Sequence, residues 1–219
     1  MAVPKLHGPS LAPSAGGAPR EIVILLHGYG SNGADLLSLA PYWRRARPHA
    51  LFVAPNAPER CPGAPGGFQW WGLTELSRAS IAAGAARAAP ALDGFIDAQL
   101  AEHGLSEDRL VLVGFSQGTM MALHVGPRRE RQIAGIIAYS GMLADAGGLG
   151  REVVSKPPIL LIHGAADSVV PASAFHEAKA ELHRLGFAVE DHLTPGLDHS
   201  VDETGLRLGE RFVKRVLDE

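Results

Sequence analysis

The sequence contains a serine in a setting that favours nucleophilic chemistry. The pentapeptide Gly114–Gly118, Gly-Phe-Ser-Gln-Gly, directly follows a mostly apolar run at residues 109–113 and opens a segment with a helical pattern. This order of strand, Gly-x-Ser-x-Gly and helix is typical of a nucleophile elbow, a tight turn that holds the serine hydroxyl clear of the sheet. Glycines at both flanking positions leave room for the turn. Ser116 is therefore the candidate nucleophile, with the unpaired N–H groups of the next helix behind it.

A serine hydroxyl is a weak nucleophile, so it needs a general base, and the base needs an acid to orient it. In folds with a nucleophile elbow, an acid and then a histidine follow the serine, each after a strand. Residues 159–163 have the pattern of a strand that leads to Asp167, and residues 187–193 that of a strand that leads to His199. The sequence thus predicts a catalytic triad of Ser116, Asp167 and His199.

The aspartates in this part of the chain allow other interpretations. Asp167 could be a helix N-cap or a turn former, as an aspartate before a helix often is. Asp198 is the rival acid, but it neighbours His199 in the sequence, so its side chain is expected to point elsewhere. Asp191 lies inside the predicted last strand. The order of all three residues, each at the end of a predicted strand, favours Asp167.

An oxyanion hole needs two N–H donors, and the residue after the nucleophile, Gln117, is expected to supply one. The other is expected from the loop after the first strand, residues 27–33, His-Gly-Tyr-Gly-Ser-Asn-Gly. This loop also matches the Gly-x-Gly-x-x-Gly spacing of dinucleotide-binding loops. Such a fold expects an acidic residue at the end of the second strand. Residues 54–58, Ala-Pro-Asn-Ala-Pro, contain none, which disfavours nucleotide binding.

Composition narrows the class of protein. The 219 residues, 46% hydrophobic and 20% charged, suit a single globular domain over residues 1–219. A net charge of −3 without a long basic cluster disfavours nucleic-acid binding. No apolar stretch approaches the roughly 20 residues that span a bilayer, and no signal-peptide pattern is present, so no stable membrane insertion is expected. The single cysteine, Cys61, fits a cytoplasmic protein and is interpreted as an incidental thiol in a loop without an elbow.

Apolar runs of strand length alternate with segments of helix length. Continuous runs of β-branched residues and leucine indicate parallel strands covered on both faces, so a three-layer α/β fold with a mostly parallel central sheet is predicted. Residues 1–19 are predicted to form an extended N-terminal arm, and Pro90 to break or kink the long helix. The predicted strands are 21–26, 50–54, 110–113, 133–139, 158–163 and 187–193, and the predicted helices are 33–39, 81–103, 116–125, 172–185 and 202–217.

Taken together, six motifs resemble those of the phospholipase/carboxylesterase family of small α/β-hydrolases, which includes the acyl-protein thioesterases. They are His27–Gly30, Ala54–Pro58, Gly114–Gly118, Tyr139–Gly141, His163–Pro171 and His199, and they follow one another in the family's order. The resemblance implies an α/β-hydrolase fold without a large cap domain and the triad named above. It also implies an oxyanion hole made by the backbone N–H groups of Tyr29 and Gln117.

Members of this family bind the acyl chain in a shallow apolar groove. Trp70 and Trp71, in the long loop after the second strand, are candidates to line it. Core packing is the other interpretation, and we expect one indole in each place. Met142 and Leu143 are further groove candidates. Relatives commonly carry an aspartate shortly after the tryptophan, where this chain has Gly72, so no role for an acid is carried over.

These observations predict a serine carboxylesterase for short to medium acyl esters, acting through an acyl-enzyme as a cytoplasmic monomer or homodimer. Lysophospholipids and acyl thioesters are the alternative substrates. A non-catalytic ligand-binding protein of this fold is disfavoured because all three triad residues are present. Peptidase or lactonase activity is disfavoured by the length of the chain and by the serine at the elbow. No cofactor or metal is expected, because His27 and His163 lack a carboxylate–histidine cluster at ligand spacing.

Overall fold

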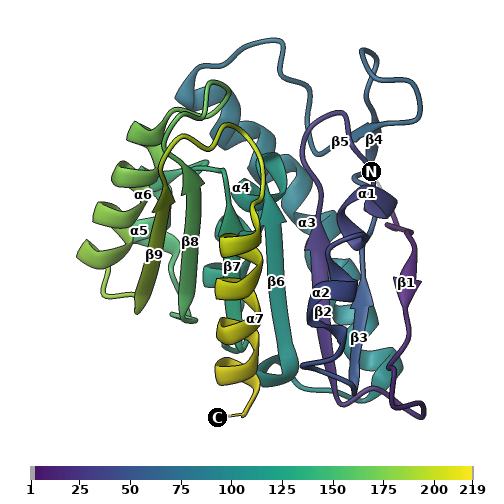
Figure 1. The fold of residues 1–219 in the computed structure, drawn as a ribbon. Helices are drawn as coiled ribbons and strands as arrows, with labels where there is room; N and C mark the ends of the chain where they lie inside the picture. The colour runs from purple at the N-terminus through teal and green to yellow at the C-terminus, as the bar shows by residue number, and fades with distance from the viewer. Residues whose placement is uncertain (1–2, 219) are drawn as a thin grey trace.

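The computed structural model describes residues 3–218 and contains a seven-stranded sheet in the order β1-β3-β2-β6-β7-β8-β9 (Figure 1). Six strands are parallel, and β1 alone runs antiparallel to its neighbour. The strands are β1 (Ser10–Leu11), β2 (Glu21–Leu26), β3 (Ala50–Val53), β6 (Leu110–Phe115), β7 (Gly135–Tyr139), β8 (Ile159–Gly164) and β9 (Val189–Thr194). A separate antiparallel pair is formed by β4 (Glu59–Arg60) and β5 (Phe68–Gln69). Residues 1 and 2 of the predicted arm and residue 219 of the predicted domain lie outside the described part of the chain.

Helices cover both faces of the sheet and enclose two apolar cores (Figure 1). Along β2, Ile22, Ile24 and Leu26 enter one core, whereas Val23 and Leu25 enter the other. The first core also contains residues of α3 (Arg78–His103), α4 (Gln117–Val125), α5 (Ala146–Glu152) and α6 (Ala172–Arg184), and the second those of α1 (Gly33–Leu37), α2 (Ala40–Arg44) and α7 (Glu203–Asp218). This confirms the three-layer α/β-hydrolase fold, and residues 3–218 include no cap domain.

Pro90 was predicted to break or kink the long helix, and a break is wrong, because α3 continues through it to His103. Buried residues on both sides of the proline, including Ala88 and Leu92, lie in the same core and hold the helix to the sheet. Pro90 itself is exposed, as is Ala86, whose carbonyl loses its helical N–H partner. Water can therefore replace the missing hydrogen bond, and core packing outweighs the cost of the proline.

The N-terminal arm is tied to one edge of the sheet. Its residues Ser10 and Leu11 form β1, which pairs with β3. Two further backbone hydrogen bonds extend this attachment, from the Ala54 N–H to the Pro9 carbonyl at 3.0 Å and from the Asn56 N–H to the His7 carbonyl at 2.9 Å. The arm thus covers strand β3, which would otherwise be the edge of the sheet.

The strand order reverses between β2 and β6. The chain leaves β2 toward α1 and α2 on one face, whereas it leaves β6 toward α4 on the opposite face. In open parallel sheets, a crevice forms at such a point, outside the carboxyl ends of the strands. The loop at residues 27–33 and the turn at Ser116 both lie at this crevice. Within residues 3–218, no helix has the length and apolar character needed to cross a bilayer.

Candidate active site

Ser116 occupies the turn between β6 and α4 in a strained backbone conformation, with φ 54° and ψ −116°. Its N–H donates a hydrogen bond to the Tyr139 carbonyl at 3.0 Å. The Thr119 hydroxyl donates to the same carbonyl at 2.7 Å. The end of the neighbouring strand β7 therefore holds the turn from two points, which presents the serine at the carboxyl edge of the sheet.

Close backbone contacts explain the two glycines of the elbow. A Cβ on Gly118 would lie 1.9 Å from the Leu26 carbonyl oxygen, and one on Gly114 would lie 2.4 Å from the Thr119 nitrogen. Neither contact is sterically possible, so α4 can approach β2 and β6 this closely only with glycine at both positions. This is the structural basis of the Gly-x-Ser-x-Gly pattern in this chain.

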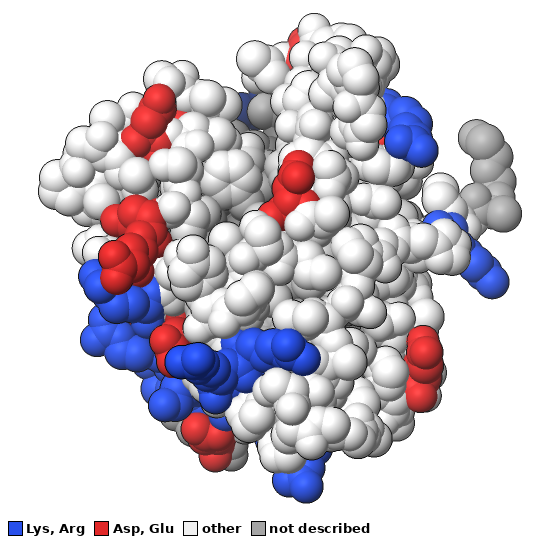
Figure 2. Space-filling view, turned by 45° about the vertical axis from the view of Figure 1, so that its right-hand side comes forward, with Lys and Arg blue, Asp and Glu red and all other residues white. Residues whose placement is uncertain are grey.

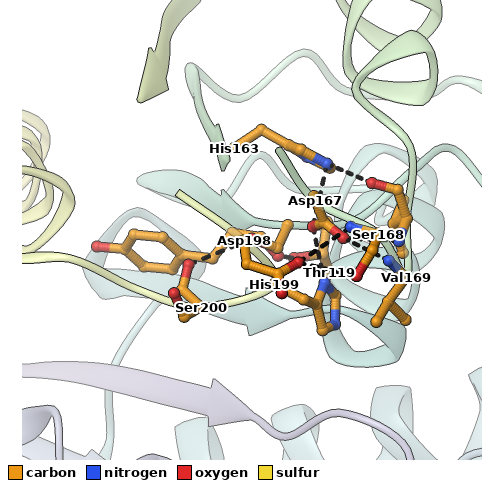
Figure 3. Close-up of polar contacts among 11 residues, drawn as sticks. Thr119, His163, Asp167, Ser168, Val169, Asp198, His199 and Ser200 are labelled. Carbon is orange, nitrogen blue, oxygen red and sulfur yellow. Dashed lines mark hydrogen bonds and ion pairs between the residues drawn. The ribbon is translucent and has the colours of Figure 1, made fainter. Parts of the chain in front are cut away.

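Asp167 and His199 are in contact, although 32 residues separate them in the chain. The His199 Nδ1 lies 2.7 Å from the Asp167 Oδ2 (Figure 3). The other carboxylate oxygen, Oδ1, accepts hydrogen bonds from the N–H groups of Val169 and Val170 at 2.9 and 2.8 Å. The Asp167 side chain is fully buried, and the Nε2 of His163 lies 3.3 Å from its Oδ2. The N–H groups of Val169 and Val170 thus fix the direction of the carboxylate toward His199.

Asp198 points away from the imidazole of His199. Its Oδ1 accepts hydrogen bonds from both the backbone N–H and the hydroxyl of Ser168, each at 3.0 Å (Figure 3). These hydrogen bonds, led by the one from the Ser168 N–H, lower the pKa of Asp198. The carboxylate therefore connects the loop that contains Asp167 to the loop that contains His199.

Ser116 and His199 line one cavity of about 500 Å³. The ring of Phe115 packs beside His199, with 4.8 Å between the ring centroids. Ser31 and Asp35 contribute polar groups to the wall. The aliphatic part of the wall comes from Leu36, Leu39, Leu73, Val169 and Val201. A cavity of this size and character suits a small ligand with an apolar portion.

The loop after β2 brings Tyr29 to the same cavity. A Cβ on Gly28 would lie 3.2 Å from the Ser116 Cβ, so the loop passes directly beside the nucleophile. The N–H groups of Tyr29 and Gln117 have no hydrogen-bond partner within residues 3–218. Tyr29 and Ser116 both line the cavity. Two free backbone donors beside a serine are the components of an oxyanion hole.

The four predicted groove residues lie elsewhere. Trp70 and Trp71 are each only 1% exposed, and neither lines the cavity of Ser116. The Trp70 Nε1 donates to the His27 carbonyl at 3.0 Å, and the ring of Trp71 packs against Gly84 of α3. Both indoles are therefore core residues, whereas one was expected in the groove.

Met142 and Leu143 line a different depression, beside Arg78 and Ala146. The aliphatic residues that do line the active-site cavity were not among the predicted groove residues. Their common signal is position: Leu36 and Leu39 follow the loop after β2, and Val169 and Val201 follow Asp167 and His199.

Two buried histidines and the cysteine have defined surroundings. His27 and His163 are 0% and 2% exposed, and each donates or accepts hydrogen bonds with the backbone. Cys61 is a buried free thiol that raises the pKa of the neighbouring Tyr29. Across residues 3–218, no group of three or more His, Cys, Asp or Glu side chains has the spacing of a metal site.

The arrangement of elbow, buried acid and histidine on this sheet defines the α/β-hydrolase class. The sequence profile of the phospholipase/carboxylesterase family matches residues 12–217, and the chain belongs to this family of hydrolases. Among solved structures, it is similar to esterase PE8, with 42% identity, a TM-score of 0.92 and coverage of 97% of this chain and 100% of the other. Acyl-protein thioesterase 1 of Schizosaccharomyces pombe is 30% identical over 97% of both chains. A probable carboxylesterase of Oryza sativa is 29% identical over 94% of this chain and 82% of its own.

Proposed function

We propose that the protein is a serine carboxylesterase with Ser116 as nucleophile, His199 as general base and Asp167 as orienting acid. The observation that carries the proposal is the 2.7 Å contact between His199 Nδ1 and the buried Asp167 carboxylate. This contact keeps a proton on Nδ1, which leaves Nε2 as the acceptor in the cavity that Ser116 also lines.

In the proposed reaction, the Ser116 Oγ attacks the ester carbonyl carbon while the His199 Nε2 takes the hydroxyl proton. The carbonyl oxygen becomes an oxyanion and accepts hydrogen bonds from the Tyr29 and Gln117 N–H groups. Collapse of this intermediate breaks the bond to the alcohol, which receives the proton from His199. Water then attacks the acyl carbonyl carbon while His199 takes its proton, and this proton passes to the Ser116 Oγ as the acyl–serine bond breaks and the carboxylic acid leaves.

The cavity supports short to medium acyl esters as substrates. Its aliphatic wall offers a place for an acyl chain, and its volume of about 500 Å³ lies within the range of small-molecule sites. On the face in Figure 2, the upper end of the molecule, where the strands have their carboxyl ends, bears few charged side chains. The 42% identity to esterase PE8, over 97% of this chain and 100% of the other, supports an ester as the substrate.

Acyl-protein thioesterase or lysophospholipase activity is the second candidate. It is supported by the full-length similarity to acyl-protein thioesterase 1 of Schizosaccharomyces pombe. We also propose a cytoplasmic location, in line with the single cysteine, and a monomeric or homodimeric state.

The test is a set of initial rates on p-nitrophenyl esters from acetate to palmitate, with a palmitoyl thioester and a lysophospholipid alongside. Wild type and Ser116→Ala are compared, and circular dichroism verifies that both are folded. We expect the variant to lose about 10⁴-fold or more in kcat. A maximum at short acyl chains supports the esterase, and a clear preference for the thioester or the lipid supports the second candidate. Equal rates for the two proteins would refute the triad.

A further inference from the structure

We propose that His27 is a positioning residue of the oxyanion hole, because it fixes the peptide unit that contains the Tyr29 N–H. The inference rests on the proposed function and extends it to a residue outside the triad. His27 directly follows strand β2 and is completely buried beneath the loop at residues 28–33. It contacts neither the nucleophile nor the base in the hydrogen-bond network, so it would act through the backbone.

Both ring nitrogens of His27 have a backbone partner. The Nε2 lies 3.0 Å from the backbone nitrogen of Ala57, and the Nδ1 lies 2.7 Å from the Gly28 carbonyl oxygen. A backbone N–H can only donate, so Nε2 must be the acceptor, and the ring proton must be on Nδ1. Nδ1 then donates to the Gly28 carbonyl. Only the neutral imidazole can make both bonds, and burial favours that form by lowering the pKa of His27.

The carbonyl that His27 binds belongs to the same peptide unit as the Tyr29 N–H. A trans peptide is planar, and its C=O and N–H bonds point in opposite directions. A bond that holds the Gly28 carbonyl toward the buried imidazole therefore directs the Tyr29 N–H away from it. This N–H has no partner within residues 3–218, and Tyr29 lines the cavity beside Ser116. The hydrogen bond also polarises the peptide and strengthens its N–H as a donor.

Trp70 connects the backbone of His27, one peptide unit before the Tyr29 N–H, to the side chain of Gln117. Its Nε1 donates to the His27 carbonyl at 3.0 Å, while its backbone N–H donates to the Gln117 Oε1 at 2.9 Å. The Gln117 Nε2 donates in turn to the Trp71 carbonyl at 2.9 Å. His27 and the Gln117 side chain are thus attached to one buried segment, Trp70 and Trp71. The buried Trp70 indole thus helps to hold the backbone next to the active site.

Two substitutions separate the functions of the two ring nitrogens. The side-chain nitrogen of asparagine falls near the Nδ1 position, so His27→Asn retains the donor to Gly28 and loses the acceptor for Ala57. The amide of glutamine reaches the Nε2 position, so His27→Gln retains the acceptor and loses the donor. Loss of a whole oxyanion donor costs about 10²- to 10³-fold in kcat. We expect misalignment in His27→Gln to lower kcat about 10- to 100-fold with KM within about twofold, and His27→Asn to recover most of this loss.

The control is His124→Gln, which changes a buried histidine eight residues after Ser116, at the far end of α4. It is expected to lower the melting temperature without a change in kcat. A second readout is the affinity for a trifluoromethyl ketone, whose adduct with serine bears an oxyanion. His27→Gln should lose affinity by about the same factor as kcat. Equal kcat values for the Asn and Gln variants would overturn the inference.

A measurement on the wild-type protein avoids any problem of folding. Two-bond ¹⁵N–¹H correlation spectra of the histidine rings report the tautomer, and we expect His27 to be neutral with its proton on Nδ1 at pH 7. A proton on Nε2 would overturn the inference. Failure of the proposed function is distinguishable, since it would appear as unchanged turnover in Ser116→Ala. If Ser116→Ala loses activity while His27→Gln keeps wild-type kinetics, the triad stands and only the role of His27 is refuted.

Discussion

The carboxylate of Asp198 accepts two hydrogen bonds from Ser168, each at 3.0 Å, although 30 residues separate the two. Ser168 directly follows Asp167, and Asp198 directly precedes His199. The residues adjacent to the proposed acid and base are therefore joined to each other, parallel to the contact between the acid and the base. This second connection restricts the movement of one loop relative to the other.

We therefore expect Asp198→Ala and Ser168→Ala to lower kcat by about two- to tenfold each, because the His199 loop gains freedom to move. The double variant should be no worse than the more impaired single variant, since both remove the same contact. A double-mutant cycle on kcat/KM measures this coupling. Fully additive losses would mean that the two side chains act independently.

Asp167→Asn should be far more damaging than Asp198→Asn. The asparagine oxygen can still accept from the N–H groups of Val169 and Val170, so its NH₂ group would face the His199 Nδ1. Two donors cannot pair, and the imidazole must then carry its proton on Nε2, where it cannot act as base. We expect kcat to fall about 10³- to 10⁴-fold, compared with less than about threefold for Asp198→Asn. The reverse order would identify Asp198 as the functional acid.

Asp35 should give the site a preference based on charge. Among the described residues that line the cavity, it is the only acidic one, and none is lysine or arginine. A choline ester should therefore be hydrolysed faster than its uncharged 3,3-dimethylbutyl analogue, by about two- to fivefold at low salt, and the difference should shrink as salt rises. Asp35→Asn, which retains an oxygen acceptor for Ser31 and Asn32, should abolish the difference. If Asp35→Asn still prefers the choline ester, then groups other than Asp35 cause the preference.

His124 should make the fold sensitive to mild acid. Burial, with a smaller effect of Arg128, lowers the pKa of His124 to about 4 in the folded protein, whereas the unfolded chain titrates near 6.5. Between these values the unfolded state binds more protons, so stability falls as the pH falls through this range, by about 3 kcal/mol in total. In urea unfolding, the decrease in the free energy of unfolding from pH 7 to pH 4.5 should be smaller for His124→Gln than for wild type. An identical loss would exclude His124 as a source of the acid sensitivity.

Two glycines of α3 offer a matched test of core packing. A Cβ on Gly84 would lie 2.4 Å from the Trp71 ring, so Gly84→Ala should destabilise the fold by about 1–3 kcal/mol. Gly94 lies in the same helix with no atom within 4 Å of such a Cβ. Gly94→Ala should therefore stabilise the protein by up to about 1 kcal/mol through helix propensity. Urea midpoints compare the two, and similar values would show that Trp71 moves aside without cost.

The sequence was sufficient to predict the parallel sheet, because long apolar runs such as residues 21–26 and 159–163 have few alternatives to a doubly covered strand. It also marked Ser116, Asp167 and His199 as candidates, since their types and chain order reflect a chemical requirement. The short strand β1 was missed because two residues have no pattern of their own, and pairing with β3 alone stabilises them.

The wall of the cavity was harder to predict. Trp70 and Trp71 resemble groove residues by size, but the hydrogen bond to the His27 carbonyl and the fit against Gly84 place both indoles in the core. These contacts join residues 43 positions apart or on different elements, and no local pattern encodes them. Tertiary packing likewise decided the course of α3 at Pro90.

The backbone angles of Ser116 bear on how selection has acted on this chain. A φ of 54° with a ψ of −116° is unfavourable for any residue with a side chain and costs about 1–3 kcal/mol. Glycine would occupy the same backbone conformation at little cost. Selection for folding alone would therefore replace this serine. The strain at Ser116 is therefore the stability cost of a hydroxyl at this turn, the cost that the proposed role of the nucleophile would explain.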